Sequence, residues 1–114
     1  MTKLLIKDFT NSTRAISAID GEKVYQTIYS HFQKNEPVVL DFYGIELTIT
    51  AFLNSSIGKL YGVYPVDKIK ELLNIENLHH DEKLLLKLVI DKAKERFGKN
   101  ISENNDNIDL VNES

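Results

Sequence analysis

Residues 38–42 of the chain read Val-Val-Leu-Asp-Phe and stand between Pro37 and Gly44. A continuous apolar run of this length, bounded by turn residues, predicts a strand buried on both faces, as in the centre of a sheet covered by helices. Asp41 is the only charged residue in the run. We interpret it as a strand-end carboxylate that accepts nearby backbone N–H groups or faces water; a functional role is the alternative.

Helical periodicity precedes this strand. Val24, Ile28 and Phe32 recur at intervals of four residues, which predicts an amphipathic helix over residues 20–34. Asp20 is the expected N-cap, because a short polar side chain there can accept a hydrogen bond from a free N–H of the first turn.

A second helix is predicted after the strand, over residues 50–62. Thr50 is the expected N-cap, with Thr48 as the rival, and Gly62 suits the C-terminal end. Residues 44–49 form a loop or a short strand extension in this interpretation. The apolar side chains that share one face of the helix are Phe52, Leu53, Ile57, Leu60 and Tyr61.

Shorter elements complete the outline. Residues 3–7 predict a strand near a sheet edge, because lysines flank the apolar run. Residues 14–19 suggest a second short strand. Residues 65–68 predict a helical turn, and residues 71–76 predict a strand, although their spacing also fits a helix.

The last helix is expected over residues 80–97, with Gly98 as the residue that ends it. The chain carries 14 Lys+Arg and 17 Asp+Glu, a formal net charge of −3. Residues 99–114 alone carry −3, since they hold four acids and Lys99. We therefore divide the chain into a charge-balanced domain, residues 1–98, and an acidic, Asn-rich disordered tail, residues 99–114.

Composition excludes several classes of protein. A domain without net charge lacks the basic surface that binds nucleic acid. The absence of cysteine excludes disulfides, thiol nucleophiles and Cys-based zinc sites. Because no export signal or membrane span is visible, we expect a cytoplasmic protein that does not bind membranes.

The sequence also lacks the motifs of common active sites. It contains no Gly-rich phosphate loop and no Gly-x-Ser-x-Gly elbow. His79 and His80 are adjacent, so on a helix they diverge and do not readily ligate one metal ion. We therefore expect no enzyme, no cofactor and no metal site. The five tyrosines are interpreted as packing the core or lining a protein interface.

One arrangement could carry function. A buried strand, a turn and the hydroxyl of Thr50 lead into a helix N-terminus, where free N–H groups favour an anion. A phosphate on Thr50 would add nearly two negative charges to an exposed corner. The alternative is that Thr50 only caps the helix.

Two stretches of this region resemble the STAS-like domain family of unknown function, a distant relative of the bacterial anti-sigma factor antagonists. They are residues 38–42 and Ala-Phe-Leu-Asn at residues 51–54, followed by Ile-Gly-Lys-Leu at residues 57–60. Residues 20–23 and 75–78 share the likeness, which covers most of the chain before the tail.

The resemblance implies a regulatory role. In the antagonists an Asp-Ser-Ser-Gly motif follows the strand, and a partner kinase of the GHKL ATPase type phosphorylates the first Ser. That Ser falls on Thr50, which makes Thr50 the possible phosphoacceptor. The other three positions hold Ile49, Ala51 and Phe52.

These observations predict an α/β, STAS-like domain with about four strands in one mixed sheet, packed with three main helices. We expect a non-enzymatic protein-interaction or regulatory module whose partner is a protein, with a GHKL-type ATPase or kinase suggested by the resemblance. The alternative is an inhibitor encoded by a phage or mobile element, similar to an anti-CRISPR protein, that blocks a host complex sterically. The expected partner-binding residues lie in residues 48–56: Thr48, Thr50, Phe52, Asn54, Ser55 and Ser56.

Overall fold

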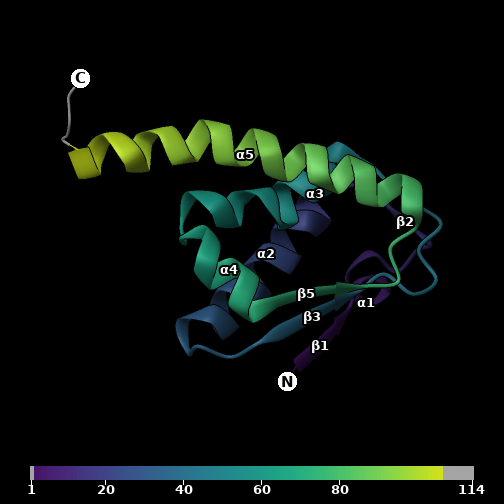
Figure 1. Cartoon of the computed structure of the whole chain (residues 1–114). Coiled ribbons are helices and arrows are strands. Elements are labelled where there is room, and N and C mark those ends of the chain that lie inside the picture. The colour runs from purple at the N-terminus through teal and green to yellow at the C-terminus, as the bar shows by residue number, and fades with distance from the viewer. Residues whose placement is uncertain (1, 107–114) are drawn as a thin grey trace.

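A computed structural model describes the backbone of residues 2–106 and the side chains of residues 2–97. It is an α/β structure with helices packed on parallel strands (Figure 1). The helices are α1 (Ile6–Thr10), α2 (Ala18–Gln33), α3 (Thr50–Ser56), the 3-10 helix η1 (Gly58–Gly62), α4 (Val66–Leu72) and α5 (His80–Asp106).

The strands form two sheets. β1 (Thr2–Leu5), β3 (Val38–Asp41) and β5 (Leu73–Glu76) make a parallel sheet in the order β1-β3-β5. β2 (Arg14–Ala15) and β4 (Leu47–Thr48) make a parallel pair of their own. All four residues of β3 are buried, so the predicted central strand is confirmed.

The prediction of one four-stranded mixed sheet is wrong. After β1 the chain turns into α1, which ends at Asn11 in the left-handed conformation with φ of 52°. This turn carries β2 away from the three-stranded sheet, and β2 pairs with β4 instead. Every strand pair is parallel because a crossover connection separates the two strands of each pair.

The structure has four main helices, where three were predicted. α4 is two turns long and leads directly into β5, so residues 65–68 form more than the predicted single turn. The predicted strand over residues 71–76 is confirmed for Leu73–Glu76. Asn77 follows it with φ of 61°, which turns the chain toward α5.

The start of α2 also differs from the prediction. The N-cap is Ser17, whose hydroxyl accepts hydrogen bonds from Ile19 N at 3.1 Å and Asp20 N at 3.2 Å. Asp20, the predicted cap, lies in the first turn, where its charge suits the helix dipole.

The predicted helix over residues 50–62 is two elements. α3 ends at Ser56, and η1 continues with tighter turns from Gly58 to Gly62. Gly58 is buried against Val89 of α5: a Cβ built on Gly58 would lie 3.4 Å from a Val89 methyl. The approach of α5 therefore coincides with the change of helix type.

The last helix is longer than predicted. α5 continues through Gly98 to Asp106, because a glycine inside a helix costs only about 1 kcal/mol and removes no hydrogen bond. Figure 1 shows α5 lying over α3, with its C-terminal part projecting beyond the other elements. Residues 107–114 of the predicted tail lie outside the described residues, and the division at residue 98 stays a prediction.

The core lies between the sheet and the helices. Among its completely or almost completely buried side chains are Phe32, Phe42, Phe52, Leu40 and Leu53. Among the described helices, none combines the length and the apolar character needed to cross a membrane.

Candidate functional site

The candidate site is the corner where β2, β4 and the start of α3 meet. Thr48, at the end of β4, is 2% exposed. Its hydroxyl donates to the Ala15 carbonyl at 2.8 Å, and its backbone N–H donates to Glu82 Oε2 at 2.9 Å. Thr48 therefore joins three elements and has almost no surface to offer a partner.

The start of α3 places Thr50 differently from the prediction. Ile49 is the cap residue, with φ of −131° and ψ of 170°, and no side chain caps the helix. Thr50 is the first helical residue and is exposed. The prediction of Thr50 or Thr48 as N-cap is thus wrong, since the Thr48 hydroxyl is bound to Ala15 and Thr50 lies one position too late.

The buried face of α3 removes two further residues from the predicted docking surface. Phe52 and Ser56 are 0% exposed, and the Ser56 hydroxyl donates to the Phe52 carbonyl at 2.7 Å. α2 packs closely here, because a Cβ on Gly21 would lie 1.9 Å from Ser55 Oγ. The side chains of Phe52 and Ser56 therefore pack the core and cannot contact a partner in this conformation.

Asn54 and Ser55 keep some surface. Asn54 is exposed and Ser55 is half-buried. Both line a hollow of about 240 Å³ between α3 and α5, together with Lys59, Arg96 and Phe97 among others. Of the six predicted partner-binding residues, therefore, three have accessible side chains: Thr50, Asn54 and Ser55.

An exposed apolar patch lies next to Thr50. Ile16 and Ile49 directly follow the paired residues Ala15 and Thr48, so the two isoleucines lie side by side at the end of the two-stranded sheet. Leu47 shares the outer face with Ile49, because strand side chains alternate. We call Ile16, Leu47 and Ile49 the corner patch; their exposed fractions are 39%, 38% and 39%.

The sequence interpretation missed the corner patch. The sequence predicts a loop or a short strand extension for residues 44–49. The alternation of Leu47, Thr48 and Ile49 is the signal that indicates a strand with one apolar outer face. Ile16 gives no such signal, because its position beside Ile49 depends on β2 leaving the main sheet to pair with β4.

Asp41 is the last residue of β3. The residue is 7% exposed, and its Oδ1 accepts hydrogen bonds from Asn77 Nδ2 at 2.7 Å and from Tyr43 N at 2.9 Å. The Asn77 bond, then the Tyr43 N–H and the nearby Lys3 ammonium, lower the pKa of Asp41 below its ordinary value. Asp41 thus fixes the turns after β3 and β5, a structural role.

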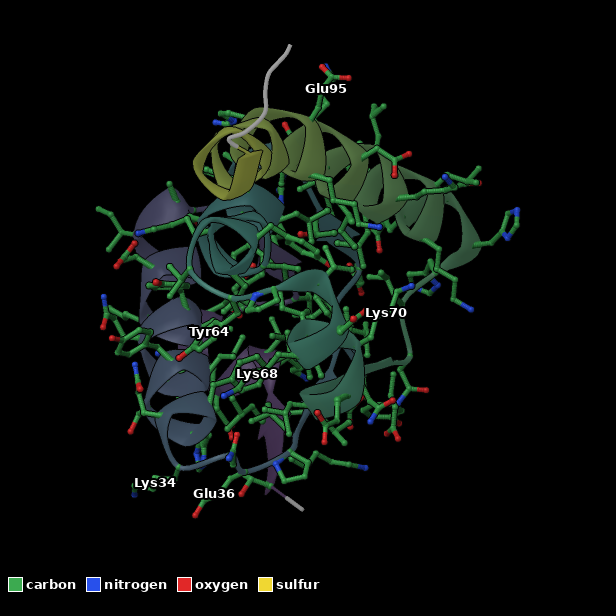
Figure 2. All side chains as sticks on the ribbon, turned by 60° about the vertical axis from the view of Figure 1, so that its left-hand side comes forward. Lys34, Glu36, Tyr64, Lys68, Lys70 and Glu95 are labelled. Atoms are coloured by element: carbon green, nitrogen blue, oxygen red, sulfur yellow. The ribbon has the colours of Figure 1, made fainter. Side chains whose placement is uncertain are left out.

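The tyrosines mostly pack the core, as expected. Tyr25, Tyr61 and Tyr64 are each 8% exposed. The Tyr64 ring meets Phe32 edge-on with centroids 5.3 Å apart, and the Lys68 ammonium lies 5.6 Å from its centroid. Figure 2 shows Tyr64 and Lys68 close together. Through its contact with Phe32, the Tyr64 ring packs against α2. Tyr43 alone of the five is largely exposed.

Among the residues that the structure describes, no group of three His, Asp or Glu side chains is placed to hold a metal ion. His79 and His80 are both exposed.

Comparison with protein families gives one match. A family model described as "STAS-like domain of unknown function (DUF4325)" matches residues 20–83, more than half of the chain. The matched segment runs from the first turn of α2 to the first turn of α5. Neither the curated proteins nor the solved structures gave a significant match.

Proposed function

The chain belongs to the STAS-like domain family of unknown function, and we propose that it is a non-enzymatic interaction module that docks on a partner protein. The docking surface consists of the corner patch with Thr50 and Asn54. Thr48, Phe52 and Ser56 support this surface from below and do not contact the partner.

The exposure of the corner patch is the observation that carries the proposal. Three exposed branched aliphatic side chains lie at this corner: Leu47 in β4, Ile49 at the cap of α3, and Ile16 directly after β2. Contiguous apolar surface of this kind on a folded domain marks an interaction site more often than scattered hydrophobic residues do. A partner that covers it gains apolar burial without any rearrangement of the backbone.

Thr50 gives this surface a means of regulation. Its side chain is exposed beside Ile49, at a helix start that no side chain caps. A phosphate on Thr50 would place nearly two negative charges next to the corner patch. Apolar docking would then weaken, because the partner would have to desolvate the phosphate. We propose a GHKL-type ATPase or kinase as the partner, on the basis of the family resemblance.

The proposal is tested by binding between the purified chain and a GHKL-type ATPase encoded in the same genome, measured by isothermal titration calorimetry. Ile49→Asp and Asn54→Arg should each abolish detectable binding. Leu88→Asp is the matched control, since Leu88 is an exposed leucine on α5, and it should bind as the wild type does. Thr50→Glu should weaken binding, and Thr50→Ser should preserve it.

Unchanged binding by both Ile49→Asp and Asn54→Arg would refute the docking surface. If no such ATPase binds and a host complex of another kind is bound and blocked through the same residues, the mobile-element inhibitor is the correct interpretation.

A further inference from the structure

A second surface, separate from the corner, lies between β5 and α5. The two elements border an open groove of about 400 Å³. Its apolar lining is aliphatic and consists of Ile75, Leu78, Leu86 and Ile90. In Figure 1, β5 is the strand of the sheet drawn nearest to α5.

One side of this groove is the edge of a sheet. β5 is the last strand in the order β1-β3-β5, and among the described residues no strand pairs with its outer side. An unpaired strand edge presents a row of backbone N–H and C=O groups. An extended peptide can satisfy these groups by adding as another strand.

The rim of the groove is positively charged. Lys83, Lys87 and Lys94 line it together with one acid, Asp91. The Asp91 carboxylate is bound by Lys87 at 3.1 Å. Within the described part of the chain, neither Lys83 nor Lys94 forms an ion pair, so the groove carries local positive charge in a protein of net charge −3.

We propose that this groove binds an extended peptide of aliphatic and acidic residues, which adds as a strand to the open edge of β5. The aliphatic side chains pack on Leu86 and Ile90, and the acidic ones pair with the Lys83 and Lys94 ammonium groups. Charge complementarity favours this ligand over a second copy of the chain, because two such grooves facing each other would repel.

The same features disfavour a nucleic acid. The groove lining is aliphatic and offers no aromatic ring on which a base could stack. The main-chain groups of β5 match the spacing of another peptide backbone and not that of a sugar–phosphate chain.

The test uses the full chain and a fluorescein-labelled peptide, Gly-Glu-Ser-Val-Ser-Val-Ser-Glu-Gly, whose acidic and aliphatic side chains share one face of a strand. Binding is measured by fluorescence anisotropy. The double substitution Lys83→Glu with Lys94→Glu should weaken binding by about tenfold or more, since both rim charges then repel the probe. Lys92→Glu is the matched control, because Lys92 is exposed on α5 outside the groove, and it should bind as the wild type does.

A second probe tests the strand addition. The same peptide with alternate backbone amides N-methylated keeps its charge and apolar side chains but loses donors to β5, and it should bind about tenfold more weakly. Asn54→Arg, which alters the corner, should leave probe binding unchanged, so failure of the corner proposal and failure of this one are distinguishable.

Three outcomes overturn the proposal. They are equal binding by the wild type and the double lysine variant, equal binding of the methylated and unmethylated peptides, and tighter binding of a single-stranded oligonucleotide than of the peptide. Circular dichroism of the lysine variants verifies that they are folded; Lys83→Gln with Lys94→Gln, which should also weaken binding, replaces them if they are not.

Discussion

The Glu82 carboxylate accepts a hydrogen bond from the Thr48 backbone N–H at 2.9 Å, across 34 positions of sequence. Because the Thr48 hydroxyl donates to the Ala15 carbonyl, this bond ties the first turn of α5 through β4 to β2. The other carboxylate oxygen, Glu82 Oε1, is buried and has no hydrogen-bond partner in the described part of the chain. The geometry of the corner thus depends on a helix from the far end of the domain.

Substitution of Glu82 should therefore loosen the corner. Glu82→Ala leaves the Thr48 N–H without an acceptor and should lower the free energy of unfolding by about 1–3 kcal/mol. Glu82→Gln keeps an acceptor oxygen and should cost less than half as much. Urea denaturation measures both. Asp81→Ala, at an exposed neighbouring position, is the control, and equal effects of Glu82→Ala and Asp81→Ala would contradict the prediction.

The hydrogen bond between Asn77 and Asp41 should stabilise the ends of β3 and β5. Asn77→Gly tolerates the left-handed φ of 61° but removes the Nδ2 donor, and should cost about 1–2 kcal/mol at pH 7. Asn35→Gly is the matched control, since Asn35 has φ of 59° and is exposed. Urea denaturation compares the two variants; an equal loss in both would show that the bond to Asp41 contributes nothing.

The same bond predicts a dependence on pH. The folded state lowers the pKa of Asp41 from its ordinary value of 3.8, chiefly through Asn77. The resulting stabilisation is complete above that value and is lost as the pH falls through the lower pKa of the folded state. Between pH 5 and about pH 2, the wild type should therefore lose more stability than Asn77→Gly. Parallel pH profiles would contradict this.

The contact between α2 and α3 requires a glycine. A Cβ at residue 21 would lie 1.9 Å from Ser55 Oγ and 2.8 Å from the Phe52 carbonyl oxygen. Gly21→Ala should therefore lower the free energy of unfolding by about 1–3 kcal/mol, despite the higher helix propensity of alanine. Adding Ser55→Ala removes the nearer clash but not the backbone one, so rescue should be partial. Thermal denaturation of the single and double variants checks this, and a stabilised Gly21→Ala would refute the close packing.

Two hydroxyl residues near helix starts should differ in their effect on stability. Ser17 caps α2 with two hydrogen bonds, so Ser17→Ala should cost about 1 kcal/mol. Thr50 makes no capping bond, so Thr50→Ala should change stability by less than about 0.5 kcal/mol. Denaturant midpoints measure the stability of the two variants. A larger loss of stability in Thr50→Ala than in Ser17→Ala would contradict the prediction and indicate that Thr50 caps α3.

Much of the fold could be predicted from local pattern. Residues 38–40 are apolar, as expected for a central strand covered on both faces. The spacing of Val24, Ile28 and Phe32 predicts a helix, whichever residue caps it. These features depend on neighbours in sequence. The exact cap of α2 was missed, because Ser17 and Asp20 are both good capping residues and the choice depends on where β2 ends.

The candidate site was less predictable, because it depends on contacts between distant residues. By sequence, Thr48 is a candidate cap or docking residue. In the structure its hydroxyl donates a hydrogen bond to the Ala15 carbonyl, so it serves neither role. Phe52 and Ser56 lie on the buried face of α3, which α2 approaches closely at Gly21. The packing of α2 and α5 therefore decides which of residues 48–56 remain accessible. Local sequence patterns carry no information about that packing.

The parallel pairing of every strand has a consequence for how the chain acquires its structure. Thr2 pairs with Val38, Val38 with Leu73, and Arg14 with Leu47, so no strand in the described residues pairs with its successor in sequence and no hairpin can form early. Each pairing must first close a long loop, which slows folding relative to a helical bundle of equal length. During synthesis on the ribosome, the three-stranded sheet cannot be completed before Glu76 has emerged. Until then α2 is the longest element that can form from local interactions alone.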